Sequence, residues 1–378
     1  MVGSTNVNFG RSTAISRRLR RAAEVAMGEV LGAKKGERVL IITNPGGDVQ
    51  QISLALYDAA IDAGAAPTVL FQPAKTQLDF AEDSVIHALR SSPDIAISVS
   101  SGKLGKDRFA MRKNYKYRGK SLNHIFDYLL VSKKARSFWS PSVTVEMFER
   151  TVPVDYAKLR RSCATLKKAF DTAGKVRITS KKGTDLVLGL RGRKAFTDDG
   201  NSSKPGAGGN LPAGEMFISP ELGAGEGTVI YDGCISSDKG VILIKTQVRV
   251  TVKNNLVTNI TGGREASLLR ATLGRAETAT RHFAKEGRIT RADLTDYLRN
   301  IYNLGELGIG LNEKARIVGN MLEDEKVFRT CHIAIGSNYD EDAKALIHLD
   351  GLVRNPTIEL IYKGGRSKRV MEDGDLLI

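Results

Sequence analysis

The sequence predicts two domains: an α/β domain with an open parallel sheet over residues 1–150, and an α+β domain with a mainly antiparallel sheet over residues 151–378. Hydrophobic residues make up 41% of the 378 residues, which is enough apolar material for two cores. Strand and helix patterns alternate along the first part of the chain, whereas runs of strand patterns precede helices in the second. This order of elements distinguishes the two fold classes.

An amphipathic helix is expected near the N-terminus. Its apolar residues recur at helical spacing and are Ile15, Leu19, Ala22, Ala26 and Val30. Residues 1–23 contain no acid but carry Arg11, Arg17, Arg18, Arg20 and Arg21, a composition that superficially resembles a transit peptide. We favour the helix, because its apolar face can pack on the domain that follows.

A βαβ unit follows this helix. Residues 37–44 have the pattern of a buried strand, residues 49–65 of a helix ended by Gly64, and residues 66–73 of a second, parallel strand. A helix over residues 84–90 and strands over residues 94–100 and 126–132 extend the pattern. Pro45, Gly46 and Gly47 follow the first strand, where such folds bind ligands, but the spacing is not that of a dinucleotide site.

The second domain begins with a helix over residues 153–173 and two strands within residues 175–190. Residues 196–214 are rich in Gly, Ser, Asn and Pro and are expected to form a loop. Strands are predicted over residues 227–235, 240–252 and 256–262, and helices over residues 265–284 and 291–302.

Cysteine usage and hydropathy set the expected compartment. Cys163, Cys234 and Cys331 are odd in number and widely spaced, so neither a disulfide framework nor a cysteine zinc motif is predicted. No run of eighteen apolar residues and no secretory signal pattern is present. We therefore expect a cytoplasmic protein that does not bind membranes.

The formal net charge of +15 raises the question of nucleic acid. Residues 103–120, here called the basic segment, carry Lys103, Lys106, Arg108, Arg112, Lys113, Lys116, Arg118 and Lys120, with Phe109, Tyr115 and Tyr117 between them. Such interleaving can engage phosphates and bases. Because no motif of a nucleic-acid module accompanies it, we predict a solvated loop and no nucleic-acid partner.

Metal-binding residue types cluster near the C-terminus. Two of the five histidines, His332 and His348, lie with Tyr339 and Asp350 within nineteen residues. Around His348 the residues alternate as in a strand, so His348 and Asp350 share a face. Imidazole plus carboxylate without thiolate is typical of zinc, cobalt, manganese or iron held for chemistry. The alternative is that each histidine is a hydrogen-bonded core residue and the acid is solvated.

Longer motifs carry a family resemblance. The segments NLPAGEMFISP, NLGELGIGLNEKARIVGNMLEDEKVFRTCHIAIG and IHLDGLV, together with GERVLIITNP and SFWSPSVTVEMFERTVPVDY, resemble the aminopeptidase T, aminopeptidase S and PepS family of metallo-aminopeptidases. The similarity covers most of the chain, with the motifs in the family's order. It implies an N-terminal α/β domain, a C-terminal metal-binding catalytic domain and a homodimer.

The resemblance also implies a site. Its metal ligands would be Glu215, Glu306, Glu325, His332, His348 and Asp350, holding two divalent ions such as zinc, cobalt or manganese, with Tyr339 as the catalytic tyrosine. Glu325 fits the spacing of the family's motif least well, because it lies seven residues before His332. The implied reaction is hydrolysis of N-terminal residues from peptides that have a free N-terminus.

Two alternatives remain open. A related branch contains dioxygenases that open dihydroxypyridine rings with a single iron(II) on two histidines and one carboxylate, and His332, His348 and Asp350 also fit that triad. A non-catalytic, metal-dependent binding protein that uses the basic segment is the second alternative. The number of candidate ligands favours two metals over one.

Overall fold

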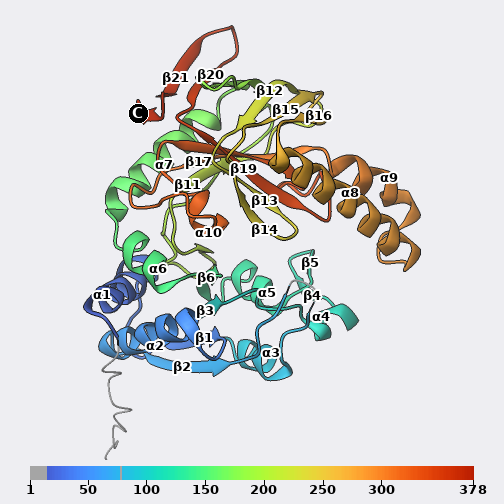
Figure 1. The fold of residues 1–378 in the computed structure, drawn as a ribbon. Helices are drawn as coiled ribbons and strands as arrows, with labels where there is room; N and C mark the ends of the chain where they lie inside the picture. Colours follow the sequence, from blue (N-terminus) through green and yellow to red (C-terminus); the bar gives the residue numbers. More distant parts are fainter. Residues whose placement is uncertain (1–14, 77–78) are drawn as a thin grey trace, which may run out of the picture. The chain divides into compact units, whose positions relative to one another are not determined.

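The computed structural model describes residues 15–76 and 79–378, and the chain divides into two compact units (Figure 1). The first unit comprises Met1–Pro153 and Gly200–Ala213, and the second comprises Val154–Asp199 and Gly214–Ile378. The boundary that we expect after residue 150 stays a prediction. Residues 200–213 belong to the first unit, so the chain returns to it after the second unit has begun.

The first unit contains a parallel five-stranded sheet, as predicted. In the order β10-β6-β3-β1-β2, the strands are Gly208–Asn210, Arg136–Pro141, Ile95–Ser100, Arg38–Thr43 and Ala66–Phe71. All four pairings are parallel. The small hairpin of β4 (Tyr115–Tyr117) and β5 (Lys120–Leu122) is separate.

The first unit also contains helices, some of which pack on the parallel sheet. They are α1 (Arg17–Val25), which continues as a π-helix over Ala26–Val30, α2 (Gly47–Asp62), α3 (Asp83–Arg90), α4 (Arg108–Arg112), α5 (Ile125–Val131) and α6 (Val145–Thr151). The expected N-terminal helix is present, with Leu19, Ala22, Ala26 and Val30 buried. Arg11, named in that prediction, lies outside the described residues. α3 and α5 share a core with Leu40 of β1.

One strand assignment was wrong. Residues 126–132, predicted as a strand, form most of helix α5, and the strand that pairs with β3 is β6 instead. The helix buries Ile125, Phe126 and Leu129, which is helical rather than alternating spacing. The side chain of His124 accepts a hydrogen bond from the N–H of Phe126 and caps the helix.

The aromatic rings of the basic segment contact other side chains of this protein. Tyr115 donates a hydrogen bond from its hydroxyl to Asp107 at 2.9 Å and stacks at a tilt on Tyr128. The guanidinium of Arg90 lies 4.5 Å from the ring centre of Phe109. Rings held in this way have less surface for stacking on bases.

We therefore expect no appreciable binding of nucleic acid. Labelled duplex and single strands should give no anisotropy change at micromolar protein in about 50 mM salt, where phosphate contacts are strong. Neutralising Lys113, Lys116 and Arg118 together should change nothing. Binding that weakens steeply with salt and disappears in this triple variant would contradict the prediction.

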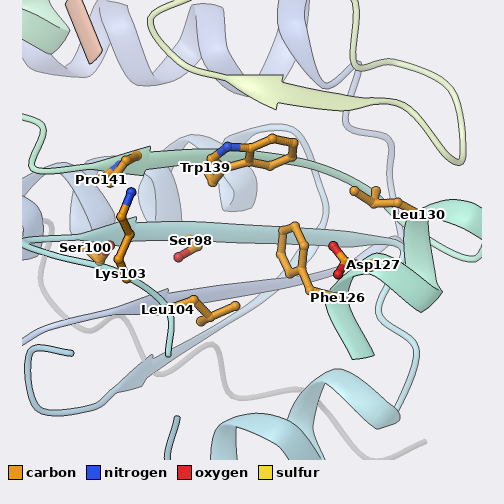
Figure 2. Close-up of a pocket in the computed structure, with 9 residues that line it drawn as sticks. All are labelled: Ser98, Ser100, Lys103, Leu104, Phe126, Asp127, Leu130, Trp139 and Pro141. Atoms are coloured by element: carbon orange, nitrogen blue, oxygen red, sulfur yellow. The ribbon is translucent and has the colours of Figure 1, made fainter. Parts of the chain in front are cut away.

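A cavity of about 300 Å³ opens in the first unit near the carboxyl ends of β3 and β6 (Figure 2). It is lined by Ser98, Ser100, Lys103, Leu104, Phe126, Asp127, Leu130, Trp139 and Pro141. Gly46 and Gly47, which follow β1 at the position where such folds bind ligands, do not line this cavity. Gly46 instead precedes α2, and its N–H bonds to Oε1 of Gln50 at 2.5 Å.

The second unit has two antiparallel sheets. In the order β14-β13-β19-β18-β17-β11-β9, the first consists of Gly240–Leu243, Cys234–Ser237, His348–Arg354, Thr330–Gly336, Leu304–Gly310, Glu215–Ile218 and Phe196–Asp198. In the order β16-β15-β12-β8-β7-β20-β21-β22, the second consists of Leu256–Thr261, Val248–Lys253, Gly225–Tyr231, Asp185–Gly189, Lys175–Thr179, Thr357–Ile361, Ser367–Glu372 and Asp375–Leu376. The predicted α+β class is confirmed.

Its helices are α7 (Tyr156–Phe170), α8 (Arg264–Lys285), α9 (Arg291–Asn300) and α10 (Met321–Asp324). Three finer predictions were wrong. The expected loop over residues 196–214 contains β9 and β10. Residues 227–235 and residues 240–252, each predicted as one strand, form parts of β12 and β13 and of β14 and β15. Among the described residues, no helix has the length and apolar character needed to cross a bilayer.

Candidate metal centre

Five of the six predicted metal ligands lie on one face of the seven-stranded sheet. Glu215 lies on β11, Glu306 on β17, His332 on β18, and His348 and Asp350 on β19. Glu306 is opposite Ala334, and Ala334 is opposite Asp350 in the strand register. Side chains of directly paired residues point to the same face, so four neighbouring strands bring these donors together.

Glycines on the same face make room for the donors. From Glu306 to Gly310, β17 alternates so that its leucine and isoleucine enter the core and its glycines lie beside the ligands. Gly308 is paired with His332, and a Cβ added to Gly308 would lie 2.0 Å from the Nε2 atom of His332. The imidazole therefore occupies the space that any other residue at 308 would fill.

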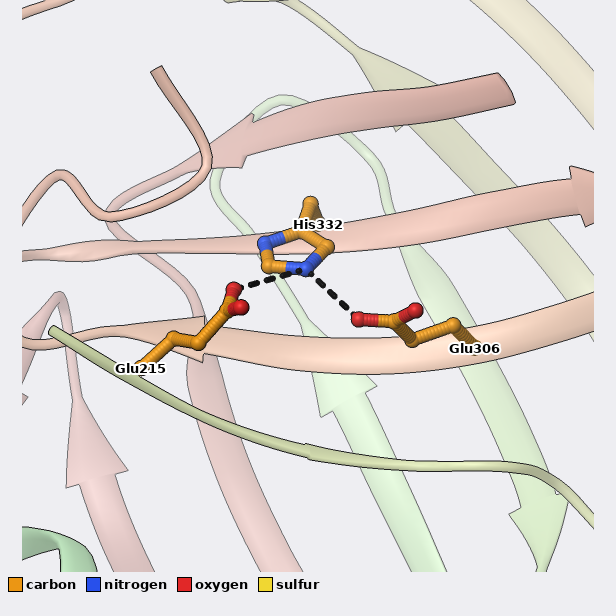
Figure 3. Close-up of side chains that lie close together, drawn as sticks. All are labelled: Glu215, Glu306 and His332. Atoms are coloured by element: carbon orange, nitrogen blue, oxygen red, sulfur yellow. Dashed lines mark hydrogen bonds and ion pairs between the residues drawn. The ribbon is translucent and has the colours of Figure 1, made fainter. Parts of the chain in front are cut away.

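Two groups of side chains could each hold a metal ion. The first group is Glu215, Glu306 and His332, whose donor atoms lie within 4.8 Å of one another (Figure 3). The Nε2 atom of His332 is 3.1 Å from Oε1 of Glu306 and 3.5 Å from Oε2 of Glu215. All three side chains are buried.

The second group shares Glu306 and adds His348 and Asp350. The Nε2 atom of His348 is 3.2 Å from Oε2 of Glu306 and 3.1 Å from Oδ1 of Asp350. Its Nδ1 atom lies 2.9 Å from the carbonyl oxygen of Ser337, which can only accept a hydrogen bond. Nδ1 therefore carries a hydrogen, so Nε2 faces the carboxylates with a lone pair when the ring is neutral and with a proton when the ring is charged.

The contacts between imidazole and carboxylate within each group call for a cation. A neutral imidazole lone pair facing two carboxylates is an acceptor facing acceptors, which requires either a proton or a metal ion between them. In the first group, Oε2 of Glu215 is buried and makes no hydrogen bond among the described residues. Nitrogen and oxygen donors of this kind fit zinc, cobalt, manganese or iron(II).

Neighbouring charges raise the pKa of His332 and lower the pKa of Asp350. Burial lowers the pKa of His332, but the carboxylates of Glu306 and Glu215 outweigh burial and raise it to about 9. Burial raises the pKa of Asp350, but His348 outweighs it and lowers that pKa to about 2. Without metal, the histidines and the carboxylates beside them therefore form ion pairs at neutral pH.

The metal-free protein should consequently lose stability at alkaline pH. A histidine whose folded pKa is raised to about 9 contributes stability that is complete below its unfolded value of about 6.5 and disappears as pH rises through 9. Thermal unfolding of chelator-treated protein between pH 6 and 10 measures this loss. A melting temperature that stays flat across this range would contradict the prediction.

Lys326 is a site residue that the sequence reasoning missed. Its ammonium is fully buried, 2.5 Å from Oε1 of Glu215, 2.6 Å from Oε1 of Glu325 and 3.5 Å from Oδ2 of Asp198. Burial lowers the pKa of Lys326, but these carboxylates raise it well above its ordinary value. Glu325, expected as a further ligand, is in neither metal group among the described residues and pairs with Lys326. Its role as a ligand stays a prediction.

Tyr339 lies on the loop between β18 and β19, beside the second group. Its ring centre is 5.5 Å from that of His348 and 4.9 Å from that of Phe217, and Phe217 stacks on Phe196 at 5.5 Å. Tyr339 and Phe196 are 55% and 42% exposed, so this aromatic row reaches solvent. The negative charge of Glu306 raises the pKa of Tyr339, which keeps its hydroxyl protonated as a donor.

Comparison with known proteins identifies relatives of this chain. The family model NicX, 2,5-dihydroxypyridine 5,6-dioxygenase, matches residues 141–360, which is more than half of the chain. The search of curated proteins found no match to this chain. Two solved structures resemble its fold over nearly their whole length.

The first is 2,5-dihydroxypyridine dioxygenase from Pseudomonas putida KT2440, with a TM-score of 0.70 and 18% identity over 95% of this chain and 96% of that chain. The second is wild-type AmpT, an aminopeptidase T, from Thermus thermophilus, with a TM-score of 0.66 and 17% identity over 97% of this chain and 100% of that chain. The fold implied by the sequence motifs is thus confirmed, and it is common to both enzymes. The family model names the dioxygenase branch.

Proposed function

This chain belongs to the 2,5-dihydroxypyridine 5,6-dioxygenase family, and from that premise we propose that it is a single-metal dioxygenase that opens a dihydroxylated aromatic ring. The observation that carries this proposal is the aromatic row beside the second metal group. Phe196, Phe217 and Tyr339 offer ring faces and edges next to His348, and a planar aromatic substrate can stack there.

The donor set suits this chemistry. His332 of the first group would join His348 and Asp350 of the second in a triad of two histidines and one carboxylate that leaves coordination positions open. A bound iron(II) ion would supply affinity for dioxygen and for a ring hydroxyl, which the side chains lack. The chain contributes orientation: the hydrogen bond from Nδ1 of His348 to Ser337 holds its Nε2 toward the site.

Tyr339 would act as a hydrogen-bond donor to the reacting ring oxygens. Replacing Tyr339 by Phe keeps the ring and its stacking on Phe217 but removes the hydroxyl, so substrate affinity should change little. Turnover should fall by about 10²–10³-fold, the usual size for one transition-state donor. Steady-state kinetics with metal content checked in both proteins measures this, and a variant that keeps more than half the turnover would make Tyr339 structural.

A second candidate is the dinuclear aminopeptidase implied by the sequence motifs. The observation that favours it is that both metal groups share Glu306, because a shared carboxylate can bridge two ions about 3.5–4 Å apart. Glu215 and Asp350 would then bind one ion each, and a free substrate amine could bind an open position. Such an arrangement would favour substrates with a free N-terminus over internal peptide bonds.

One pair of assays separates the candidates. Protein reconstituted anaerobically with iron(II) should consume dioxygen with 2,5-dihydroxypyridine, and the ring absorbance should disappear at one dioxygen per ring. The same protein loaded with zinc, cobalt or manganese should not hydrolyse aminoacyl anilides or short peptides. Hydrolysis without dioxygen uptake would reject the dioxygenase and support the aminopeptidase.

A further inference from the structure

Lys326 is surrounded by three carboxylates, one of which is also a candidate metal ligand. Its Nζ atom contacts Glu215 and Glu325 at 2.5 and 2.6 Å and lies 3.5 Å from Asp198, so three carboxylates surround one ammonium. Glu215 also belongs to the first metal group, where its other oxygen lies 3.5 Å from Nε2 of His332. The lysine and the metal groups therefore compete for the same carboxylate.

The backbone fixes this position of the lysine. α10 ends at Asp324, and the chain then crosses the sheet at Gly310, where an added Cβ would lie 2.1 Å from the carbonyl oxygen of Val327. The N–H of Asn312 bonds to the carbonyl oxygen of Lys326 at 2.9 Å. Because no side chain fills position 310, residue 326 can lie directly over the ligand face.

The charges explain why a cation is needed there. Asp198 is paired with Glu215 in the register of β9 and β11, so two carboxylates are adjacent on the ligand face, and Glu325 adds a third. Buried carboxylates without a positive partner repel one another and lose their hydration. An ammonium fixed by the fold offsets part of this charge without any bound ion.

We propose that the ammonium of Lys326 takes the place of a second divalent ion, so that this chain binds one metal ion per chain. The proposal rests on the single-metal form of the proposed function. It assigns Glu215, Glu325 and Asp198 to a lysine-centred cluster and leaves His332, His348, Asp350 and Glu306 for the metal. A divalent ion could bind in the lysine cluster only if the ammonium were removed, because two cations cannot share Oε1 of Glu215 without strong repulsion.

Metal stoichiometry tests this proposal. Wild type and Lys326→Met are purified with excess manganese(II), desalted and measured by elemental analysis, with Lys253→Met, at an exposed position of β15, as the matched control. We expect one ion per chain in wild type and control and two in Lys326→Met. Electron paramagnetic resonance of the bound manganese(II) should likewise count two ions in Lys326→Met and one in wild type and control.

A second pair of variants covers failure of Lys326→Met to fold. Glu325→Gln alone and Glu325→Gln with Lys326→Met differ only at position 326, and both carry less uncompensated charge than Lys326→Met. The double variant should bind a second ion and the single variant should not. One ion in both members of this pair, or in folded Lys326→Met, would overturn the role of Lys326.

The remaining outcomes separate this inference from the proposed function. Two ions in wild type would overturn both the lysine assignment and the single-metal dioxygenase. One ion in wild type and two in Lys326→Met, with no dioxygen uptake on any dihydroxylated ring, would support the lysine assignment while rejecting the reaction.

Discussion

Replacing Asp350 by alanine should strip the metal from the protein and abolish turnover. Asp350 is buried, lies 3.1 Å from Nε2 of His348, and supplies a negative charge to the metal in either proposed reaction. Removing an outer-shell partner of a ligand typically costs 10–100-fold in metal affinity, so loss of a direct ligand should cost at least about 10²-fold. Elemental analysis after dialysis and competition with a fluorescent chelator measure the loss.

Two further variants serve as controls for the effect of Asp350→Ala on metal affinity. Asp185→Ala removes an exposed carboxylate that pairs with Arg177 on the other sheet, so metal affinity should stay at the wild-type value. Asp350→Asn keeps the shape of the side chain but not its charge, and its affinity should lie between those of alanine and wild type. If Asp350→Ala retains one tightly bound ion, Asp350 is not a ligand.

Replacing Gly308 by alanine should remove the metal without altering any ligand. The added methyl group would lie 2.0 Å from Nε2 and 2.1 Å from Cε1 of His332, so the imidazole must leave its place. We expect metal affinity to fall by about 10²-fold and turnover to fall with occupancy. Overpacking in a buried site should also lower the free energy of unfolding by about 1–3 kcal/mol.

Gly274→Ala is the matched control for this variant. Gly274 lies in α8 with no atom within 4 Å of an added Cβ, and alanine favours a helix by about 1 kcal/mol. Its metal content should equal that of wild type, with unchanged or higher stability. Wild-type metal affinity in Gly308→Ala would show that His332 is not held against β17 as described.

Much of the fold follows from local patterns. The apolar runs of β1 and β3 are flanked by Gly, Pro and Ser residues, which identify them as buried strands, and the apolar spacing of α8 is long enough to identify a helix. The short apolar run of residues 126–132 was assigned wrongly because a run of this length fits either a strand or a buried helix. There the cap provided by His124 and the packing of α5 decided the outcome.

For the candidate site, the sequence by itself determined that His348 and Asp350 share a face of one strand and that His332 lies on another strand, because side chains alternate with a period of two. Only the tertiary structure decided what surrounds them. Lys326 and Asp198 reach Glu215 through the crossing at Gly310 and the pairing of β9 with β11. Such contacts depend on register between segments far apart in the chain, and register has no signature in either segment alone.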